Sequence, residues 1–127
     1  DIAVSRGLGD VYKRQQYGLP VKIINLNNRA LGMVKQWQDM QYGGRYSSIS
    51  YEDSLPDFVK LAESFGHVGL KVEKFSELNA AMEEAFSLKD KLVFLDVLID
   101  PDEHVYPMLE AGGSMSEMRI SKKDKTF

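Results

Sequence analysis

The sequence contains no cysteine and only two histidines, His67 and His104. The lack of cysteine excludes a disulfide scaffold, a thiolate zinc site and a cysteine nucleophile in this chain. The two histidines stand far apart along the chain, so a histidine-based metal site is not expected. Any chemistry is therefore expected to depend on oxygen ligands or on a cofactor.

A strong charge of either sign is missing too, and so are long apolar segments. Sixteen basic and nineteen acidic side chains give a net charge of −3, which is too balanced to indicate a nucleic-acid or anionic-membrane partner. No apolar run approaches the roughly 20 residues of a membrane span, and the N-terminus has no signal-peptide pattern. The composition is typical of one globular domain, for which we expect a cytoplasmic location.

Three apolar runs predict buried strands, at residues 21–26, 68–72 and 92–99. Helical patterns stand between them, and this alternation predicts an α/β fold with a parallel sheet, right-handed crossovers and flanking helices. Ligands of such sheets bind outside the carboxyl ends of the strands. The loop after the first predicted strand, residues 27–33, is therefore the first candidate for a binding site.

Three helices are expected between these strands. The first covers the proline-free stretch 31–40, the second begins near Pro56 with Asp57 in its first turn, and the third is capped by Ser76. Apolar stripes at helical spacing are expected to face the core in the second and third helices. Their members are Phe58, Leu61, Ala62 and Phe65 in the second, and Leu78, Ala81, Met82, Ala85 and Phe86 in the third.

Two asparagines, Asn27 and Asn28, begin the candidate loop. Asparagine tolerates the left-handed region and forms Asx turns, so Asn-Asn is a common way to end a strand. An amide oxygen is also a suitable ligand for Mg²⁺ or Ca²⁺, and Gly32 permits the close approach of a phosphate. From the residues alone, both interpretations remain open.

Several segments together resemble the C-terminal domain of the acetolactate synthase (acetohydroxyacid synthase) large catalytic subunits, which are thiamine-diphosphate enzymes. The segments are QYGLPVKIINLNNRALGMVKQWQDMQYGGRYSS, SLPDFVKLAESFGHVGLKVEK and LVFLDVLIDPDEHVYPM. The pattern NN-x-x-LGMV-x-QWQ is characteristic of this family, whereas Asn-Asn alone is shared across thiamine-diphosphate enzymes. The resemblance runs from about residue 16 to about residue 118 and implies part of a thiamine-diphosphate-binding domain.

The resemblance implies a cofactor site in the 28–33 loop. Asn28 is expected to bind Mg²⁺ through its side-chain oxygen, and Ala30 through its backbone carbonyl. Mg²⁺ prefers six oxygen ligands, and diphosphate oxygens would complete such a set. The residues expected to line the thiamine diphosphate are Leu31, Gly32 and Met33.

The resemblance also implies a substrate channel beside the cofactor. A single tryptophan on a helix is more often part of a core, but the tryptophan of the family's QWQ segment helps to select the second keto acid. Trp37 is accordingly expected to line the channel, together with Met33 and Val34. No residue of this chain is expected to act as a catalytic acid or base.

The implied activity of the parent protein is that of an acetolactate synthase. It condenses two pyruvates to 2-acetolactate, or pyruvate with 2-ketobutyrate to 2-aceto-2-hydroxybutyrate, with CO₂ release, in the biosynthesis of valine, leucine and isoleucine. The family implies a homodimer or homotetramer, FAD in another domain, a regulatory small subunit, and a plastid location if the source is a plant. The alternatives are another thiamine-diphosphate carboligase or decarboxylase, and a non-catalytic α/β binding module.

Residues 1–15 depart from the family pattern. The family's cofactor motif begins with Gly-Asp-Gly well upstream of Asn-Asn, whereas here Gly9-Asp10 is the nearest imitation. We expect residues 1–15 to be a non-family leader left by a sequencing or assembly artefact, and residues 16–127 to be the C-terminal part of the domain with its tail. The chain alone is expected to be inactive, because it lacks the metal-binding aspartate and the domain that supplies a glutamate to the cofactor.

Overall fold

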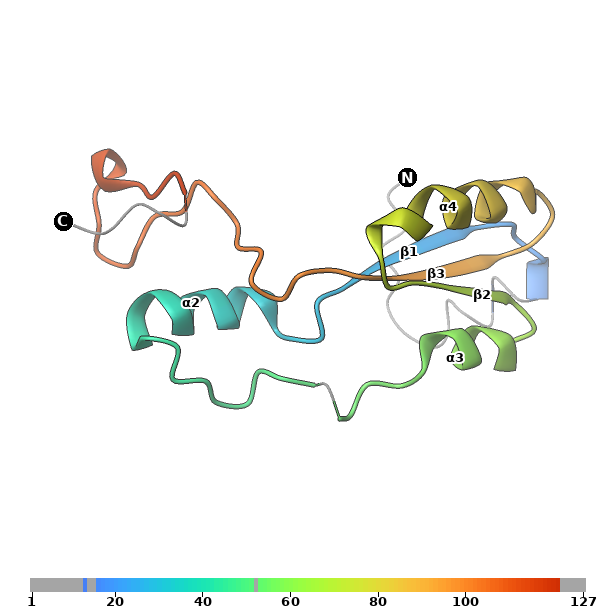
Figure 1. The fold of residues 1–127 in the computed structure, drawn as a ribbon, viewed down its shortest axis with the longest axis horizontal. Coiled ribbons are helices and arrows are strands. Elements are labelled where there is room, and N and C mark those ends of the chain that lie inside the picture. Colours follow the sequence, from blue (N-terminus) through green and yellow to red (C-terminus); the bar gives the residue numbers. More distant parts are fainter. Residues whose placement is uncertain (1–12, 14–15, 52, 122–127) are drawn as a thin grey trace. The chain divides into compact units, whose positions relative to one another are not determined.

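The computed structural model describes residues 13, 16–51 and 53–121 (Figure 1). The predicted leader, residues 1–15, lies outside the described residues except for Lys13. Contacts divide the chain into two units, which we describe separately. The first unit, called the sheet unit, comprises residues 1–27 and 54–99, and the second, called the α2 unit, comprises residues 28–53 and 100–127.

The sheet unit contains three parallel strands in the order β1-β3-β2. Their bounds are Lys22–Asn27 for β1, Val68–Val72 for β2 and Val93–Leu98 for β3. The predicted α/β fold with a parallel sheet is confirmed, and each strand lies within one residue of its expected bounds at both ends. β3 is central because its run of apolar side chains is covered on both faces.

Helices cover opposite faces of this sheet (Figure 1). On one face, α4 (Leu78–Ser87) packs against the buried side chains of Val72, Leu95 and Val97. On the other face lies α3 (Phe58–Ser64), where Phe58 stacks on Phe94 of β3 with ring centroids 5.7 Å apart. The core therefore sits between α4 and the β2-β3 pair.

The start of α3 differs from the prediction. Asp57 is the N-cap rather than a first-turn residue, and its carboxylate accepts hydrogen bonds from the amides of Val59 and Lys60, both at 3.1 Å. Leu61, predicted to face the core, is 42% exposed. Val59 approaches β2 instead, so closely that a Cβ on Gly69 would lie 2.7 Å from the Val59 backbone.

The start of α4 also differs from the prediction. Ser76 does not cap this helix, because a 3₁₀ turn, Phe75–Glu77, precedes it and Glu77 occupies the cap position. The Glu77 carboxylate accepts hydrogen bonds from the amides of Glu73 and Lys74 and so holds this turn. The predicted stripe is confirmed for four residues, but Phe86 is exposed and does not widen it.

The α2 unit is built around one helix, α2, which spans Gly32–Tyr42 and ends at Gly43 in a left-handed conformation. Isolated bridges pair Ala30 with Ser50 and Met108 with Arg119. The C-terminal segment carries a 3₁₀ turn at Met115–Glu117. None of the helices in the described part of the chain has the length and apolar character needed to cross a membrane.

Candidate functional site

The first asparagine of the Asn-Asn pair is held by the sheet. Asp96 lies in the apolar strand β3 and is nearly inaccessible to solvent. Its carboxylate accepts a hydrogen bond from Asn25 Nδ2 at 2.7 Å and another from Asn27 Nδ2 at 3.3 Å. These donors compensate for the burial of the carboxylate. Asn27 therefore has a structural role, and Asn28 is the asparagine left for a ligand.

The loop after β1 turns sharply at Asn28. Its Oδ1 accepts a hydrogen bond from the Ala30 amide at 3.1 Å, and Arg29 between them has a φ of 55°. This is an Asx turn of the kind that Asn favours. The Leu31 amide donates to Ile49 O and the Tyr51 amide to Arg29 O, each at 3.0 Å, which fixes the backbone on both sides of Ala30.

Two oxygen atoms of this loop are available for a further ligand. The backbone carbonyl of Ala30 accepts no backbone hydrogen bond among the described residues. The Asn28 Oδ1 accepts one hydrogen bond and retains a second lone pair. The structure thus brings together, in one short turn, the two residues predicted to bind Mg²⁺, in an arrangement compatible with an oxygen-seeking cation.

Gly32 leaves the space that the end of the Asn28 side chain occupies. A Cβ at position 32 would lie 2.6 Å from Asn28 Nδ2, which is closer than any real contact. The family resemblance implies that this glycine lets the cofactor approach, and the structure shows that it also makes room for the asparagine amide. Leu31, the N-cap of α2, provides no side-chain hydrogen bond to the first turn, so the amides there remain available to an anion.

The residues predicted to line a substrate channel share one side of α2. Met33 is 48% exposed, Val34 is 44% exposed, and Trp37 is half-buried. The helical period of 3.6 residues places the three together. We call Met33, Val34 and Trp37 the exposed side of α2. Exposed apolar side chains grouped in this way are typical of surfaces that contact a ligand or another part of a protein.

The opposite side of α2 carries polar residues that the sequence analysis missed. We call Lys35, Gln36 and Asp39 the anchor side. Lys35 is only 7% exposed, and its ammonium group lies 2.9 Å from Asp39 Oδ2 and 2.5 Å from Asp102 Oδ1. Burial alone lowers the pKa of Lys35, but hydrogen bonds to Asp102, Tyr46 and Asp39 outweigh it and raise this pKa above its ordinary value.

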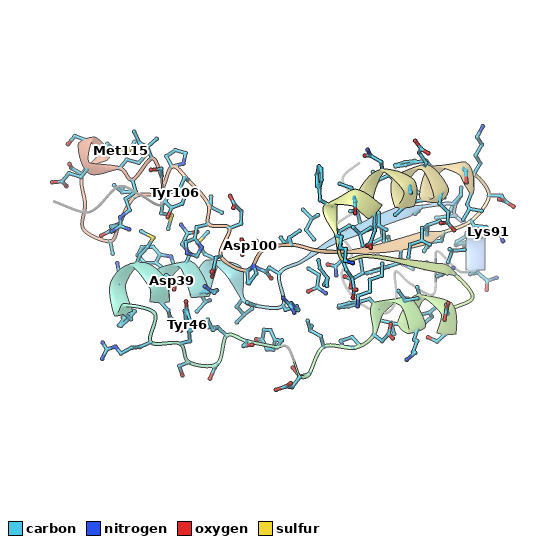
Figure 2. All side chains as sticks on the ribbon, in the orientation of Figure 1. Asp39, Tyr46, Lys91, Asp100, Tyr106 and Met115 are labelled. Carbon is cyan, nitrogen blue, oxygen red and sulfur yellow. The ribbon has the colours of Figure 1, made fainter. Side chains whose placement is uncertain are left out.

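Asp39 joins three segments of the α2 unit. Its carboxylate accepts hydrogen bonds from Tyr46 Oη and Lys35 Nζ and lies 3.0 Å from His104 Nε2. Burial raises the pKa of Asp39, but the hydrogen bonds from Tyr46 and Lys35 outweigh it and lower this pKa. Figure 2 shows Asp39 on α2 and Tyr46 on the loop that follows it. Both residues border a cavity of about 260 Å³.

Two glutamines of α2 hold backbone segments in the same way. Gln36, 1% exposed, donates from Nε2 to Val105 O at 2.9 Å and accepts at Oε1 from the Val105 amide at 2.8 Å. Gln38 donates to Ser47 O at 3.2 Å and accepts from the Ser47 amide at 2.9 Å. Each side-chain amide therefore bonds both the backbone N–H and the backbone C=O of one residue, as a neighbouring strand would.

One signal for the anchor side was visible in the sequence. Lys35 and Asp39 stand four residues apart, the spacing of an ion pair on a helix. Their partners Asp102 and His104 are distant along the chain, and no periodicity indicates them. His104 pairs with Asp39, and the absence of a histidine-based metal site stays a prediction. The described part of the chain contains no group of three His, Cys, Asp or Glu side chains able to hold a metal ion.

Comparison with known proteins identifies a family. Residues 7–97 match the family described as "Thiamine pyrophosphate enzyme, C-terminal TPP binding domain". The chain is 54% identical over 122 residues to the acetolactate synthase large subunit of Haemophilus influenzae, covering 96% of this chain and 21% of that protein. It is 50% identical over 128 residues to the acetolactate synthase isozyme 3 large subunit of Escherichia coli, covering 99% of this chain and 22% of that protein.

A more distant relative is the acetolactate synthase large subunit of Corynebacterium glutamicum, which is 40% identical over 107 residues, covering 82% of this chain and 17% of that protein. The chain thus spans about a fifth of the length of the curated relatives it matches. The resemblance found in the sequence is confirmed. The matched residues begin at position 7, inside the predicted leader, and the boundary at residue 15 stays a prediction.

Proposed function

Because this chain belongs to the family of thiamine pyrophosphate enzyme C-terminal TPP binding domains, we propose that it is the cofactor-binding segment of an acetolactate synthase large subunit. The parent protein would condense two pyruvates, or pyruvate and 2-ketobutyrate, with loss of CO₂. The relatives' names support this reaction, and the geometry of the 28–33 loop supports the role of this segment in it.

The observation that carries the proposal is the turn formed by Asn28, Ala30 and Gly32. One amide oxygen and one backbone carbonyl oxygen are hard ligands that suit Mg²⁺. Gly32 leaves the space that the Asn28 amide occupies, and the uncapped first turn of α2 offers amides to a diphosphate. We propose that Asn28 and Ala30 bind Mg²⁺ and that Leu31, Gly32 and Met33 line the thiamine diphosphate.

Thiamine diphosphate, when bound, supplies the electron sink that makes decarboxylation possible. The residues of this chain bind and orient rather than transfer protons. Asn28 and Ala30 would hold Mg²⁺ beside the charged end of the cofactor, where it would neutralise a diphosphate that a partly enclosed site would otherwise disfavour. We propose that Trp37, with Met33 and Val34 beside it, selects the second keto acid by shape, because bulk beside an apolar channel discriminates between a methyl and an ethyl group.

Mg²⁺ binding tests the loop directly. In the full-length protein that carries this segment, we expect Asn28→Ala to weaken the binding of thiamine diphosphate with Mg²⁺ by about tenfold or more, measured by isothermal titration. Asn28→Asp keeps an oxygen ligand and is expected to retain binding. Gly32→Ala should weaken binding as well, because its Cβ displaces the Asn28 side chain. Equal affinity in Asn28→Ala and the parent would contradict the proposed site.

A product assay separates this function from the alternatives. Acetolactate formed from pyruvate by the full-length protein supports the synthase. Another carboligase or decarboxylase would give acetaldehyde or a different ketol, and a non-catalytic binding module would give no product. We also propose that the full-length protein acts in the cytoplasm as a homodimer or homotetramer, with FAD in another domain and a regulatory small subunit. A measurement of molecular size tests the assembly, and flavin absorbance tests the FAD.

A further inference from the structure

The hydrogen bonds and ion pairs that join helix α2 to residues 102–105 come from its anchor side. Three of the four positions from 102 to 105 are bound there: Asp102 by Lys35, His104 by Asp39, and the backbone of Val105 by Gln36. The exposed side of the helix, with Trp37, makes none of these contacts. The rotation of α2 about its own axis is therefore fixed from the side opposite to Trp37.

Gln36 is the least exposed of the three anchor residues. Both polar atoms of its side-chain amide bond Val105, and Nε2 also donates to Met40 Sδ of the same helix at 3.8 Å. Two hydrogen bonds from one side-chain amide to the N–H and C=O of one residue fix the orientation of that residue as well as its distance. The ion pairs of Lys35 and Asp39 tolerate some rotation of the charged groups. Leaving a buried amide without its partners is costly, so the bound arrangement is strongly preferred.

Trp37 follows Gln36 directly in the sequence, and its own packing leaves it half-buried. A small rotation of α2 would move the indole ring by more than it moves the helix axis, because the ring lies far from that axis. Whatever fixes the rotation of α2 thus also fixes the position of the Trp37 ring.

We propose that Gln36 is a positioning residue for substrate selection, holding residues 102–105 on the anchor side of α2 and so fixing the orientation in which Trp37 meets the second keto acid. This inference rests on the proposed function, since it requires that Trp37 contacts the substrate. Gln36 itself touches neither substrate nor cofactor. Its contribution is expected in the choice between substrates more than in the rate with pyruvate alone.

Gln38 provides a matched control on the same helix. It makes the same pair of bonds to a backbone unit, but its partner is Ser47, in the loop after α2, and its contacts are exposed. Replacing either glutamine with methionine removes one amide of the same size from the same helix. A difference between the two variants therefore reports on what each glutamine holds, rather than on the loss of a glutamine.

The experiment uses the full-length protein with pyruvate and 2-ketobutyrate in competition. We compare Gln36→Met, Gln38→Met and Trp37→Leu with the parent and measure the ratio of 2-aceto-2-hydroxybutyrate to 2-acetolactate. Trp37→Leu and Gln36→Met are both expected to lower this ratio by about threefold to tenfold. In Gln36→Met the kcat with pyruvate alone is expected to change by less than the ratio, and Gln38→Met is expected to leave the ratio unchanged.

Hydrogen exchange at the Val105 amide provides a readout independent of activity. We expect this amide to be protected in the parent and in Gln38→Met, and to exchange faster in Gln36→Met. If Gln36→Met does not fold, Val105→Pro replaces it, because that change removes the N–H bonded to Gln36 Oε1 while the Val105 side chain is exposed. Val105→Pro is expected to lower the product ratio as Gln36→Met would.

The outcomes separate the two proposals. An altered ratio in Trp37→Leu with an unchanged ratio in Gln36→Met overturns the positioning role and leaves the proposed function standing. An unchanged ratio in Trp37→Leu contradicts the role of Trp37, and the inference about Gln36 fails with it. Equal changes in Gln36→Met and Gln38→Met indicate a general loss of helix stability and also overturn the positioning role.

Discussion

Each of the two units of this chain is stabilised internally by a different kind of contact. In the sheet unit, Val72, Leu95 and Val97 form an apolar core, and the polar contacts of α3 and α4 lie at the helix ends. Among the described residues of the α2 unit, Ile49 is the one buried apolar side chain, and the buried side chains of α2 are Lys35 and Gln36. Apolar packing stabilises without regard to direction, whereas paired polar groups fix orientation. The unit that carries the cofactor loop and Trp37 is thus the one held by directional contacts.

The largest loss of stability is expected from a substitution in the apolar core of the sheet unit. Leu95→Ala removes a side chain that is almost fully buried in β3, and we expect it to lower the free energy of opening of the sheet unit by about 2–5 kcal/mol. Leu61→Ala, on the solvent side of α3, is the control, with an expected change below about 1 kcal/mol. Hydrogen exchange at the β2 and β3 amides measures both. A loss of protection in Leu61→Ala as large as in Leu95→Ala would contradict the described core.

The next effect tests whether a buried ion pair stabilises the α2 unit. Lys35→Met leaves the carboxylates of Asp39 and Asp102 without their shared cation, and we expect α2 to open more easily by about 1–3 kcal/mol. Lys60→Met is the control, because Lys60 pairs with Asp57 at an exposed position, where such pairs contribute little. The α2 and α3 amides are compared by hydrogen exchange. Unchanged protection of α2 in Lys35→Met would mean that its polar contacts do not hold this unit.

These two units also differ in how far their structure could be predicted. The strands and the inward faces of α3 and α4 follow from hydrophobic periodicity, which is a local signal. Two predictions in the sheet unit are wrong: Leu61 and Phe86 belong to apolar stripes of their helices, but their side chains are exposed and lie outside the core. The anchor side of α2 could not be predicted, because its hydrogen bonds join residues that are distant along the chain. The cofactor loop was predicted from a family pattern. Such a pattern indicates which residues bind the cofactor, but it does not show the contacts that hold them in place.

Acidification is expected to weaken the α2 unit through the carboxylate of Asp39. The folded-state pKa of Asp39 lies below its ordinary value of 3.8, so its ionic contacts stabilise the fold above that value, and this contribution is lost as the pH falls through the lowered pKa. Hydrogen exchange of α2, corrected for its intrinsic pH dependence, should therefore show a loss of protection below about pH 4. The measurement is made in His104→Gln, which removes the imidazole that lies 3.0 Å from Asp39. Asp39→Asn in the same background should lack this transition, and a transition of equal size there would assign it to another group.

The smallest effect is expected from a polar contact of the sheet unit. Asp57→Ala removes the carboxylate that accepts hydrogen bonds from the amides of Val59 and Lys60, and we expect faster exchange in the first turn of α3 only. Asp53→Ala, four residues earlier and outside any helix, is the control. Because Asp57 is exposed, water can replace its hydrogen bonds, so the core amides of β3 should keep their protection. Loss of protection in β3 would instead show that exposed polar contacts hold the sheet unit as buried ones hold the α2 unit, and the distinction between the two units would fail.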